Sequence, residues 1–429
     1  MVARASAGSP SAAAPGAPDA SGTVQPPATS RRPLTIGMLY TSNGAANAAL
    51  GVATAASSGP NTVMSALVRA LNRRGGLAGR QLRVEYSAVD ATSSDYSTQA
   101  NAACSKFTQD KPVPVVLDFA FGNRYGMAQC LAKRGVADFG LGTSDTAGDN
   151  AVRMFASPDW MTSSRRYPAV LAGLHQTGYL TSSNKIGVLL ENCPYLQRAY
   201  QRNVMPEVAR LGLHVADTEG FDCTSGFSSA GPASASIQSA VLRFRSHGVD
   251  RVLIVSDYEQ VALLLLANDA ESQGWRPGYM LSSAAQAEVM RANIASGQWP
   301  QLHGIGWSPG LDTDDPHRPL AAPDRRCLDL IKSGGVSVSG WQNIYVATAV
   351  CSHVFFLDAA LGRSNGDARA EALMSAIGSL GARFVAPGIL DGRTFFGPTR
   401  RDGPAAVAAF GYVAACKCMR YTSAPFSAG

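Results

Sequence analysis

Residues 34–51 read LTIGMLYTSNGAANAALG, and residues 60–90 read PNTVMSALVRALNRRGGLAGRQLRVEYSAVD. The first segment begins as an apolar strand and continues into a small polar loop. In the second segment, apolar residues first recur at helical spacing and then alternate as in a strand. The helical positions are Val63, Met64, Leu67, Val68 and Leu71, and the alternating ones are Leu82, Val84 and Tyr86. The stretch therefore predicts a βαβ unit whose helix is closed by Gly75 and Gly76.

The same alternation continues along the chain. Helices are expected near residues 94–110 and 123–134, and strands at residues 113–118 and 136–141. A second series has strands at 185–190, 213–216, 251–255, 279–281 and 303–307, with helices at 196–210, 236–246, 259–273 and 286–296. Such alternation predicts an α/β protein with two doubly wound, Rossmann-like parallel-sheet lobes. The later helices, at 324–332, 342–361 and 369–380, and the short strands after them are expected to complete these lobes.

The composition favours a large globular body. Of 429 residues, 46% are hydrophobic and 16% charged, which is enough to bury a core in two units. No window approaches the length of uninterrupted apolar sequence needed to cross a bilayer. The basic residues behind the net charge of +6 are mostly scattered arginines, so we expect no nucleic-acid partner. Residues 1–32 are rich in Ala, Ser and Pro and predict a disordered tether, with no recognisable signal peptide before it.

The cysteines favour disulfides over a metal site. There are eight, and none lies in a C-x-x-C pair or a Cys/His cluster suited to zinc. Disulfides would place the body outside the cytoplasm, whereas the alternative is a set of buried thiols in a cytosolic protein. The acidic run Asp312, Asp314 and Asp315 beside His317 lacks the glycine spacing of a calcium loop, so we interpret it as a solvated loop.

Motifs that carry catalysis are missing from the sequence. It contains no H-E-x-x-H, no G-x-S-x-G, no G-x-G-x-x-G after a strand and no Walker loop. The six histidines are scattered and cannot be paired with a nucleophile. We therefore expect no enzymatic activity, no cofactor and no bound metal.

The end of the first helix carries a family resemblance. Asn72, Gly75, Gly76, Leu77, Gly79, Arg80 and Leu82 follow the pattern N-x-x-GG-x-x-G-x-x-[LIV]. In this, residues 34–422 resemble the leucine/isoleucine/valine-binding proteins, ABC transporter components with the type I periplasmic binding protein fold. The resemblance implies a hinge of three chain crossings, near Phe155, Trp307 and Arg393. Lobe one would comprise residues 33–155 and 308–393, and lobe two residues 156–307 and 394–425.

This partition implies which cysteines pair, because a disulfide between lobes that move would lock the hinge. Lobe one would contain Cys104–Cys130 and Cys327–Cys351, each joining neighbouring helices. Lobe two would contain Cys193–Cys223, joining the loops after adjacent strands. Cys416 and Cys418 form the remaining pair, and the tightness of their ring leaves it open whether they bond to each other.

Ligands of open α/β sheets bind beyond the carboxyl ends of the strands. By resemblance, Gly142, Thr143 and Ser144 would bind a ligand carboxylate through hydroxyls and backbone amides. Phe121 and Gly122 stand where the family usually has serines, which suggests a flatter, more aromatic ligand or a shifted loop. The expected ligand-binding residues are Ser42, Asn43, Phe121, Gly122, Asn123, Gly142, Thr143, Ser144, Glu191, Tyr195, Asp257, Tyr258 and Ser283. Alternatively, Thr143, Ser144, Glu191 and Asp257 only cap helices, Phe121 fills the core of its lobe, and Tyr195 packs on the surface.

One feature of amino-acid binders is absent at its usual place. In the family, an acid for the ligand ammonium follows the strand that corresponds to residues 279–281, but here that loop reads SSAAQ. Glu191, Asp257 or Asp118 can substitute for it. An α-amino acid ligand is therefore not secured by the sequence.

The resemblance implies an extracytoplasmic substrate-binding component of an ABC transporter, in the periplasm or at a bacterial cell surface. Its partners would be a small polar, amino-acid-like or aromatic carboxylate and the permease subunits. The N-terminal tether resembles the spacer of surface lipoproteins, so membrane contact would come only from a lipid anchor upstream. We expect a monomer. The alternative is a free-standing ligand-sensing module of the same fold that signals to a partner protein.

Overall fold

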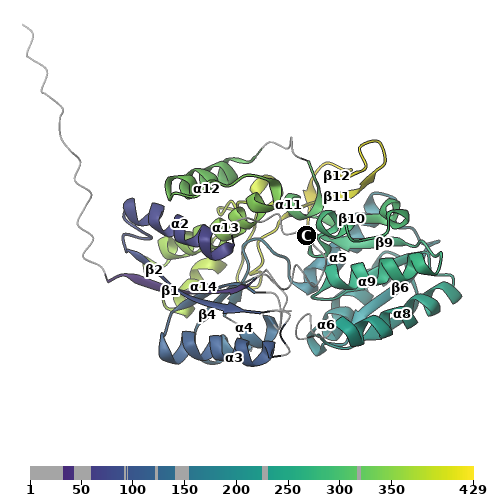
Figure 1. The fold of residues 1–429 in the computed structure, drawn as a ribbon, viewed down its shortest axis with the longest axis horizontal. Helices are drawn as coiled ribbons and strands as arrows, with labels where there is room; N and C mark the ends of the chain where they lie inside the picture. The colour runs from purple at the N-terminus through teal and green to yellow at the C-terminus, as the bar shows by residue number, and fades with distance from the viewer. Residues whose placement is uncertain are drawn as a thin grey trace, which may run out of the picture.

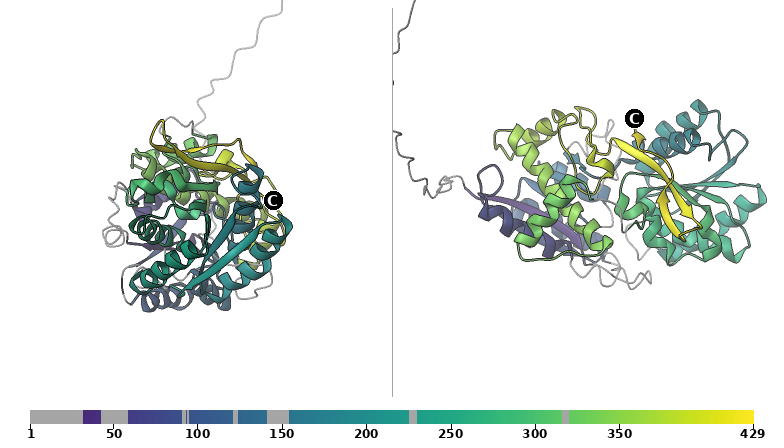
Figure 2. Two further views of the ribbon diagram at one scale, coloured as in Figure 1. Left: turned by 90° about the vertical axis from the view of Figure 1, so that its right-hand side faces the viewer. Right: turned by 90° about the horizontal axis from the view of Figure 1, so that it is seen from above.

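The computed structural model describes residues 32–42, 59–90, 93, 95–120, 124–140, 154–224, 230–315 and 320–429. These residues form two lobes, one around a five-stranded sheet and one around an eight-stranded sheet (Figure 1). Seen from above, the two sheets lie in separate bodies side by side (Figure 2). The prediction of two parallel-sheet α/β lobes is confirmed.

Lobe one has the strand order β2-β1-β3-β4-β5, with every pair parallel. The strands are β1 (Leu34–Thr41), β2 (Leu82–Val89), β3 (Val115–Phe119), β4 (Ala137–Gly140) and β5 (Phe155–Ala156). The helices between them are α2 (Pro60–Arg73), α3 (Tyr96–Ser105) and α4 (Arg124–Lys133). A π-helical turn, η1 (Lys106–Asp110), extends α3.

The glycine-rich motif after α2 fastens this helix to β2. The Asn72 side chain accepts a hydrogen bond from the Leu82 amide at 2.7 Å and donates one to the Leu82 carbonyl at 2.9 Å. Gly76 has a φ of +79°, and a Cβ there would lie 1.8 Å from the Arg80 carbonyl oxygen. Only glycine fits this turn, so the motif fixes the βαβ unit that the sequence predicts.

Lobe two has the strand order β12-β11-β10-β9-β8-β6-β7, and β13 pairs with β11. Its strands are β6 (Lys185–Glu191), β7 (His214–Phe221), β8 (Arg251–Val255), β9 (Gly278–Ser282), β10 (Leu302–Gly306), β11 (Ala406–Val413), β12 (Cys418–Tyr421) and β13 (Phe426–Ser427). Its helices are α5 (Ser163–Gln176), α6 (Pro194–Ala199), α7 (Met205–Arg210), α8 (Ala230–Ser246), α9 (Glu259–Ser272) and α10 (Ala287–Arg291). The short helix α11 (Pro309–Asp312) follows residues 307–308, the second connection between the lobes, and contacts both α10 and α13 (Trp341–Arg363). The expected helix 196–210 is divided by a π-helical turn, η3 (Tyr200–Val204), just before Pro206.

The C-terminal third of the chain contributes helices that pack in lobe one and strands that join the sheet of lobe two. Helices α12 (Ala322–Ser333) and α13 (Trp341–Arg363) contact α2, and α14 (Ala370–Gly378) contacts α13 and β4. Strand β11 then adds to β10 in an antiparallel pair, so the last strands complete the sheet of lobe two. In Figure 2 these yellow strands lie on the second lobe.

Helix α13 corrects one expectation from composition. It spans 23 residues with a mean hydropathy of 1.7 over its most apolar window, so by length and composition it could cross a membrane. However, 67% of that window is buried inside the protein, and Phe356 of α13 packs against Phe139 of β4 and against Phe396. Its apolar character is explained by this central position in the core of lobe one.

The structure contains four disulfides, and each lies within one lobe. Cys104–Cys130 joins α3 to α4, and Cys327–Cys351 joins α12 to α13. Cys193–Cys223 joins the loops that follow β6 and β7. Cys416 is bonded to Cys418 in the turn between β11 and β12, which answers the question that the sequence left open. No disulfide between these cysteines connects the two lobes.

Three connections between the lobes are bonded to one another: residues 157–162, residues 307–308 and residues 393–404. The amide of Ser157 donates to the Arg401 carbonyl, and Trp307 Nε1 donates to the Asp159 carbonyl at 3.1 Å. The buried Asp402 carboxylate accepts from both the amide and the hydroxyl of Thr162, at 2.8 and 2.9 Å, and pairs with Arg165 at 2.5 Å. Asp402 therefore fixes the start of α5 to the third connection.

Two buried carboxyl groups lie together in lobe one. Asp118 of β3 and Asp138 of β4 are both at least 97% buried, and a Cβ on Gly140 would contact both side chains. Burial, together with the charge of Asp118, raises the pKa of Asp138 well above its usual value. The folded protein thus binds a proton at Asp138 more tightly than the unfolded chain does.

We expect Asp402→Asn to lower the free energy of unfolding by about 2 kcal/mol, because the charge that holds Arg165 and Thr162 is removed. Chemical denaturation monitored by circular dichroism measures the change. Asp391→Asn is the matched control, since Asp391 pairs with Arg393 on the surface and such pairs contribute less than about 1 kcal/mol. Equal effects of the two substitutions would contradict the role of Asp402.

We also expect Asp138→Asn to stabilise the protein at alkaline pH. Because the pKa of Asp138 is raised on folding, its destabilising contribution is absent below the unfolded pKa of about 3.9 and grows as the pH rises toward the folded pKa. The melting temperature of the variant should exceed that of the native protein at pH 8, and the gap should shrink toward pH 4. Asp110→Asn, at an exposed position, should show no such trend.

Candidate functional site

The carboxyl ends of β6, β8, β9 and β10 lie next to one another along one edge of lobe two, because these strands are parallel neighbours. Helices α6 and α11 follow β6 and β10, and in Figure 1 both lie on the side of lobe two that faces lobe one. Five of the expected site residues, Glu191, Tyr195, Asp257, Tyr258 and Ser283, are positioned by this edge. We call it the lobe-two edge.

Glu191 is at the centre of the lobe-two edge and is fully buried. Its Oε1 accepts from the amide and hydroxyl of Thr224, at 2.8 and 2.5 Å. Its Oε2 accepts from the Ser256 hydroxyl at 2.8 Å and from the Asp257 amide at 3.0 Å. The carboxylate thus connects the loops after β6, β7 and β8.

Tyr195 and Asp257 come together although 62 positions separate them in the sequence. The Tyr195 hydroxyl donates to Asp257 Oδ2 at 2.5 Å, the short length expected of a charge-assisted hydrogen bond. Burial and the neighbouring Asp257 and Glu191 carboxylates raise the pKa of Tyr195 well above its usual value, so the hydroxyl remains a donor. Tyr258, beside them, is 95% buried and directly precedes α9.

Arg166 and Glu259 are buried polar residues that the sequence analysis did not single out. The Arg166 guanidinium is almost fully buried and lies 3.8 Å from Asp257 Oδ1. It donates to the Tyr167 hydroxyl at 2.7 Å and to the Ser256 carbonyl at 3.1 Å. Glu259 accepts from the amide and hydroxyl of Ser282, and burial raises its pKa against the opposing effect of Arg166. No helix was expected around Arg166, and Glu259 stood at the start of the expected helix 259–273, so no signal in the sequence joins them.

Ser283 forms hydrogen bonds with the second connection between the lobes, residues 307–308. Its hydroxyl donates to Asp312 Oδ2 at 3.0 Å and accepts from the amides of Trp307 and Ser308, at 2.8 and 3.2 Å. Asp312 Oδ2 also accepts from the Tyr421 hydroxyl at 2.7 Å. Asp312 is therefore a buried structural acceptor, which corrects its interpretation as part of a solvated loop.

Lobe one contributes fewer described residues to the region between the lobes. Ser42 is exposed at the end of β1, where its amide donates to the Val89 carbonyl. Phe119 at the end of β3 contacts the ring of His353 on α13, with centroids 4.5 Å apart. The expected site residues Asn43, Phe121, Gly122, Asn123, Gly142, Thr143 and Ser144 lie outside the described residues.

A pocket of about 410 Å³ lies where α11 meets α12 and α13. Pro309, Gly310 and Thr313 line one side, and Trp341, Ile344 and Tyr345 of α13 line another. Because α11 follows β10 and contacts β12, this pocket adjoins one end of the lobe-two edge. Trp341 and Tyr345 were missed from the sequence. Their i, i+4 spacing at the start of a helix was the signal that could have drawn attention to them.

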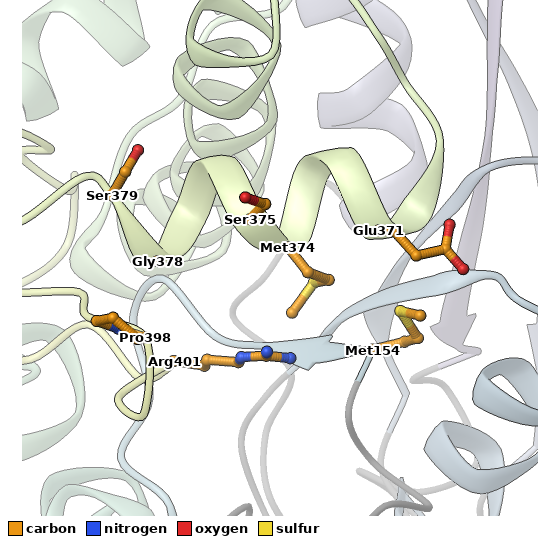
Figure 3. Close-up of a pocket in the computed structure, with 8 residues that line it drawn as sticks. All are labelled: Met154, Glu371, Met374, Ser375, Gly378, Ser379, Pro398 and Arg401. Carbon is orange, nitrogen blue, oxygen red and sulfur yellow. The ribbon is translucent and has the colours of Figure 1, made fainter.

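A second pocket, of about 530 Å³, lies on lobe one beside α14. Figure 3 shows Met374 of α14 and Met154 before β5 pointing into it, with Arg401 of the third connection beside them (Figure 3). None of the residues that line this pocket belongs to a strand end of lobe two. We therefore centre the candidate site on the lobe-two edge and the α11–α13 pocket.

The one cluster of metal-ligand types among the described residues is not available to a metal. Atoms of Glu191, Cys193 and Cys223 lie within 4.8 Å of one another. Both sulfurs are joined in a disulfide, whereas cysteine binds metals as a free thiolate. Glu191 already accepts four hydrogen bonds, so the cluster serves structure.

Comparisons with known proteins rest on structure. No protein-family model and no curated protein sequence matches the chain. A solute-binding protein of an ABC transporter from Rhodopseudomonas palustris BisB5, solved with 3,4-dihydroxybenzoic acid, superimposes with a TM-score of 0.62 at 11% identity, covering 92% of this chain and 97% of that one. A branched-chain amino acid ABC transporter protein from Thermus thermophilus with bound valine gives 0.60 at 12% identity, with coverage of 92% and 97%.

A leucine-binding protein from Thermotoga maritima gives a TM-score of 0.62 at 12% identity, covering 92% of this chain and 99% of that one. These neighbours are solute-binding proteins rather than enzymes, and the similarity extends over both lobes. At such low identity, the similarity identifies the architecture. The chain has the type I periplasmic binding protein fold.

Proposed function

We propose that this chain is the extracytoplasmic substrate-binding component of an ABC transporter. It captures a small polar, amino-acid-like or aromatic carboxylate between two closing lobes and performs no catalysis. The observation that carries this proposal is the arrangement of two α/β sheets, one parallel and one mainly parallel, joined by three connections and shared over 92% of the chain with solute-binding proteins. Carboxyl ends of parallel strands are where ligands bind in such sheets.

The chain supports a closing motion. Each disulfide remains inside one lobe, so none of them restrains the lobes relative to each other. The connections are short and bonded together, which concentrates movement at residues 157–162, 307–308 and 393–404. A ligand that contacts both lobes shifts the population toward the closed form, which the permease subunits then recognise.

The lobe boundaries and binding residues belong to the same proposal. Lobe one comprises residues 33–155 and 308–393, and lobe two residues 156–307 and 394–425. Gly142, Thr143 and Ser144 bind the ligand carboxylate, with Ser42, Asn43, Phe121, Gly122 and Asn123 beside them. Tyr195 and Tyr258 of lobe two cover the ligand from the opposite side. The four disulfides suit a protein outside the cytoplasm, where such bonds persist.

One prediction of the proposed function concerns the closure of the two lobes. A thermal-shift screen of amino acids, aromatic acids and short aliphatic carboxylates should identify a compound that raises the melting temperature, because a ligand of the folded state stabilises it by mass action. Saturation with that compound should reduce the radius of gyration measured by small-angle X-ray scattering. Tight binding with an unchanged radius of gyration would contradict capture by closing lobes.

Another prediction of the proposed function concerns the binding residues. The double variant Thr143→Ala/Tyr195→Ala should bind the identified ligand about 100-fold more weakly by isothermal titration calorimetry, because each lobe loses a contact worth about 1.4 kcal/mol. Thr181→Ala/Tyr200→Ala is the control, since both side chains make exposed hydrogen bonds away from the strand ends. Unchanged affinity in the Thr143/Tyr195 variant, with its melting temperature preserved, would refute the site assignment.

A further inference from the structure

The hydrogen bonds of the acids at the lobe-two edge indicate whether this edge can bind a ligand that carries an ammonium group. Four described acids lie there, namely Glu191, Asp257, Glu259 and Asp312. Each is at least 94% buried. A binding site for an ammonium group needs carboxylate or carbonyl oxygens that point toward the ligand. The question is whether these four acids offer such oxygens.

Three of the acids are committed to hydroxyl and amide donors of the protein. Glu191 accepts four hydrogen bonds, two on each oxygen. Both oxygens of Glu259 accept from Ser282, at 2.7 and 2.6 Å. Asp312 accepts from Ser283, Ser308 and Tyr421. These bonds hold the strand ends and the second connection together, so releasing one would disrupt the lobe itself.

Asp257 is the acid best suited to bind an ammonium group, but it also interacts with side chains of the protein. Its Oδ2 accepts the short hydrogen bond from Tyr195, and its Oδ1 faces the Arg166 guanidinium at 3.8 Å. A ligand ammonium would have to displace the Tyr195 hydroxyl, which is buried and would lose its acceptor. An ammonium left without an acceptor would be desolvated at greater cost still.

Aromatic rings lie beside Asp257 and line the adjoining pocket. The Tyr195 and Tyr258 rings lie beside Asp257, and Trp341 and Tyr345 line the adjoining pocket. Asp257 and Glu259 together carry one more charge than the nearby Arg166 neutralises. That charge is directed at internal donors, so it does not provide a ligand with hydrogen-bond acceptors.

We propose that the ligand is a carboxylate with an apolar or aromatic body and no ammonium group, and that Tyr195 excludes amines by occupying Asp257. This inference rests on the proposed function and narrows its ligand class. It makes Tyr195 a specificity-determining residue: its hydroxyl satisfies the acid that an amino acid would otherwise use. Sites of this kind discriminate strongly, because the wrong ligand leaves buried polar groups unpaired.

The test uses pairs of compounds that differ only in the amino group. They are phenylalanine and 3-phenylpropanoate, tyrosine and 3-(4-hydroxyphenyl)propanoate, and leucine and 4-methylpentanoate. Isothermal titration calorimetry on the full chain gives the dissociation constants. In each pair that binds, the compound without the amino group should bind at least 10-fold more tightly.

Tyr195→Phe provides a second measurement. It removes the hydrogen bond from Tyr195 to Asp257 Oδ2, so the preference for the compound without the amino group should fall about 10-fold. Tyr200→Phe, which removes an exposed hydroxyl bonded to Thr218, should leave the preference unchanged. Tighter binding of the amino acids, or an unchanged preference in Tyr195→Phe, would overturn the inference while leaving the proposed function intact. If none of the six compounds binds, the inference is rejected, whereas the proposed function is judged by the thermal-shift screen over the wider set of carboxylates.

Discussion

The Asp402 carboxylate joins parts of the chain that lie 240 positions apart. It accepts the amide and hydroxyl of Thr162 and pairs with Arg165, so the third connection between the lobes holds the first turn of α5. The first amides of a helix have no acceptors within the helix. At the start of α5, the Asp402 side chain of the third connection supplies an acceptor for the Thr162 amide. The geometry of lobe two relative to the connections therefore depends on this one buried acid.

The same helix start also organises the lobe-two edge. Arg166 and Tyr167 follow directly, and the Tyr167 hydroxyl both donates to the Ser256 carbonyl and accepts from the Ser256 amide, at 2.9 and 2.8 Å. Ser256 in turn donates to Glu191. The Arg166 amide donates to the Thr162 carbonyl, and the Arg166 side chain donates to the Tyr167 hydroxyl, so hydrogen bonds lead from Asp402 in the third connection to the acids of the edge. Movement at the connections and the arrangement of the site are physically linked through α5.

The sequence predicted the strands and most helices because their burial follows local periodicity, as in α2, where Val63, Met64 and Leu67 are all buried. Helix α5 was missed because Pro168 and a buried Arg166 interrupt the pattern that such reasoning depends on. The site was predicted only as a set of loops. That the Tyr195 hydroxyl occupies Asp257, 62 positions away, is a tertiary contact that spacing cannot reveal. Seven expected residues of lobe one lie outside the described residues, so their roles stay predictions.

The Cys193–Cys223 disulfide makes the hydrogen bonds of Glu191 depend on whether the surroundings are oxidising or reducing. It joins the loops after β6 and β7, and Thr224, the next residue, supplies both donors to Glu191 Oε1. Without the disulfide, the loop after β7 could withdraw and leave a buried carboxylate with half of its donors. In a reducing compartment the lobe-two edge would thus lose a restraint on its central acid. The disulfide and Glu191 together restrain an edge that carries several buried acids, and such rigidity is what the proposed ligand selection by shape and hydrogen bonding requires.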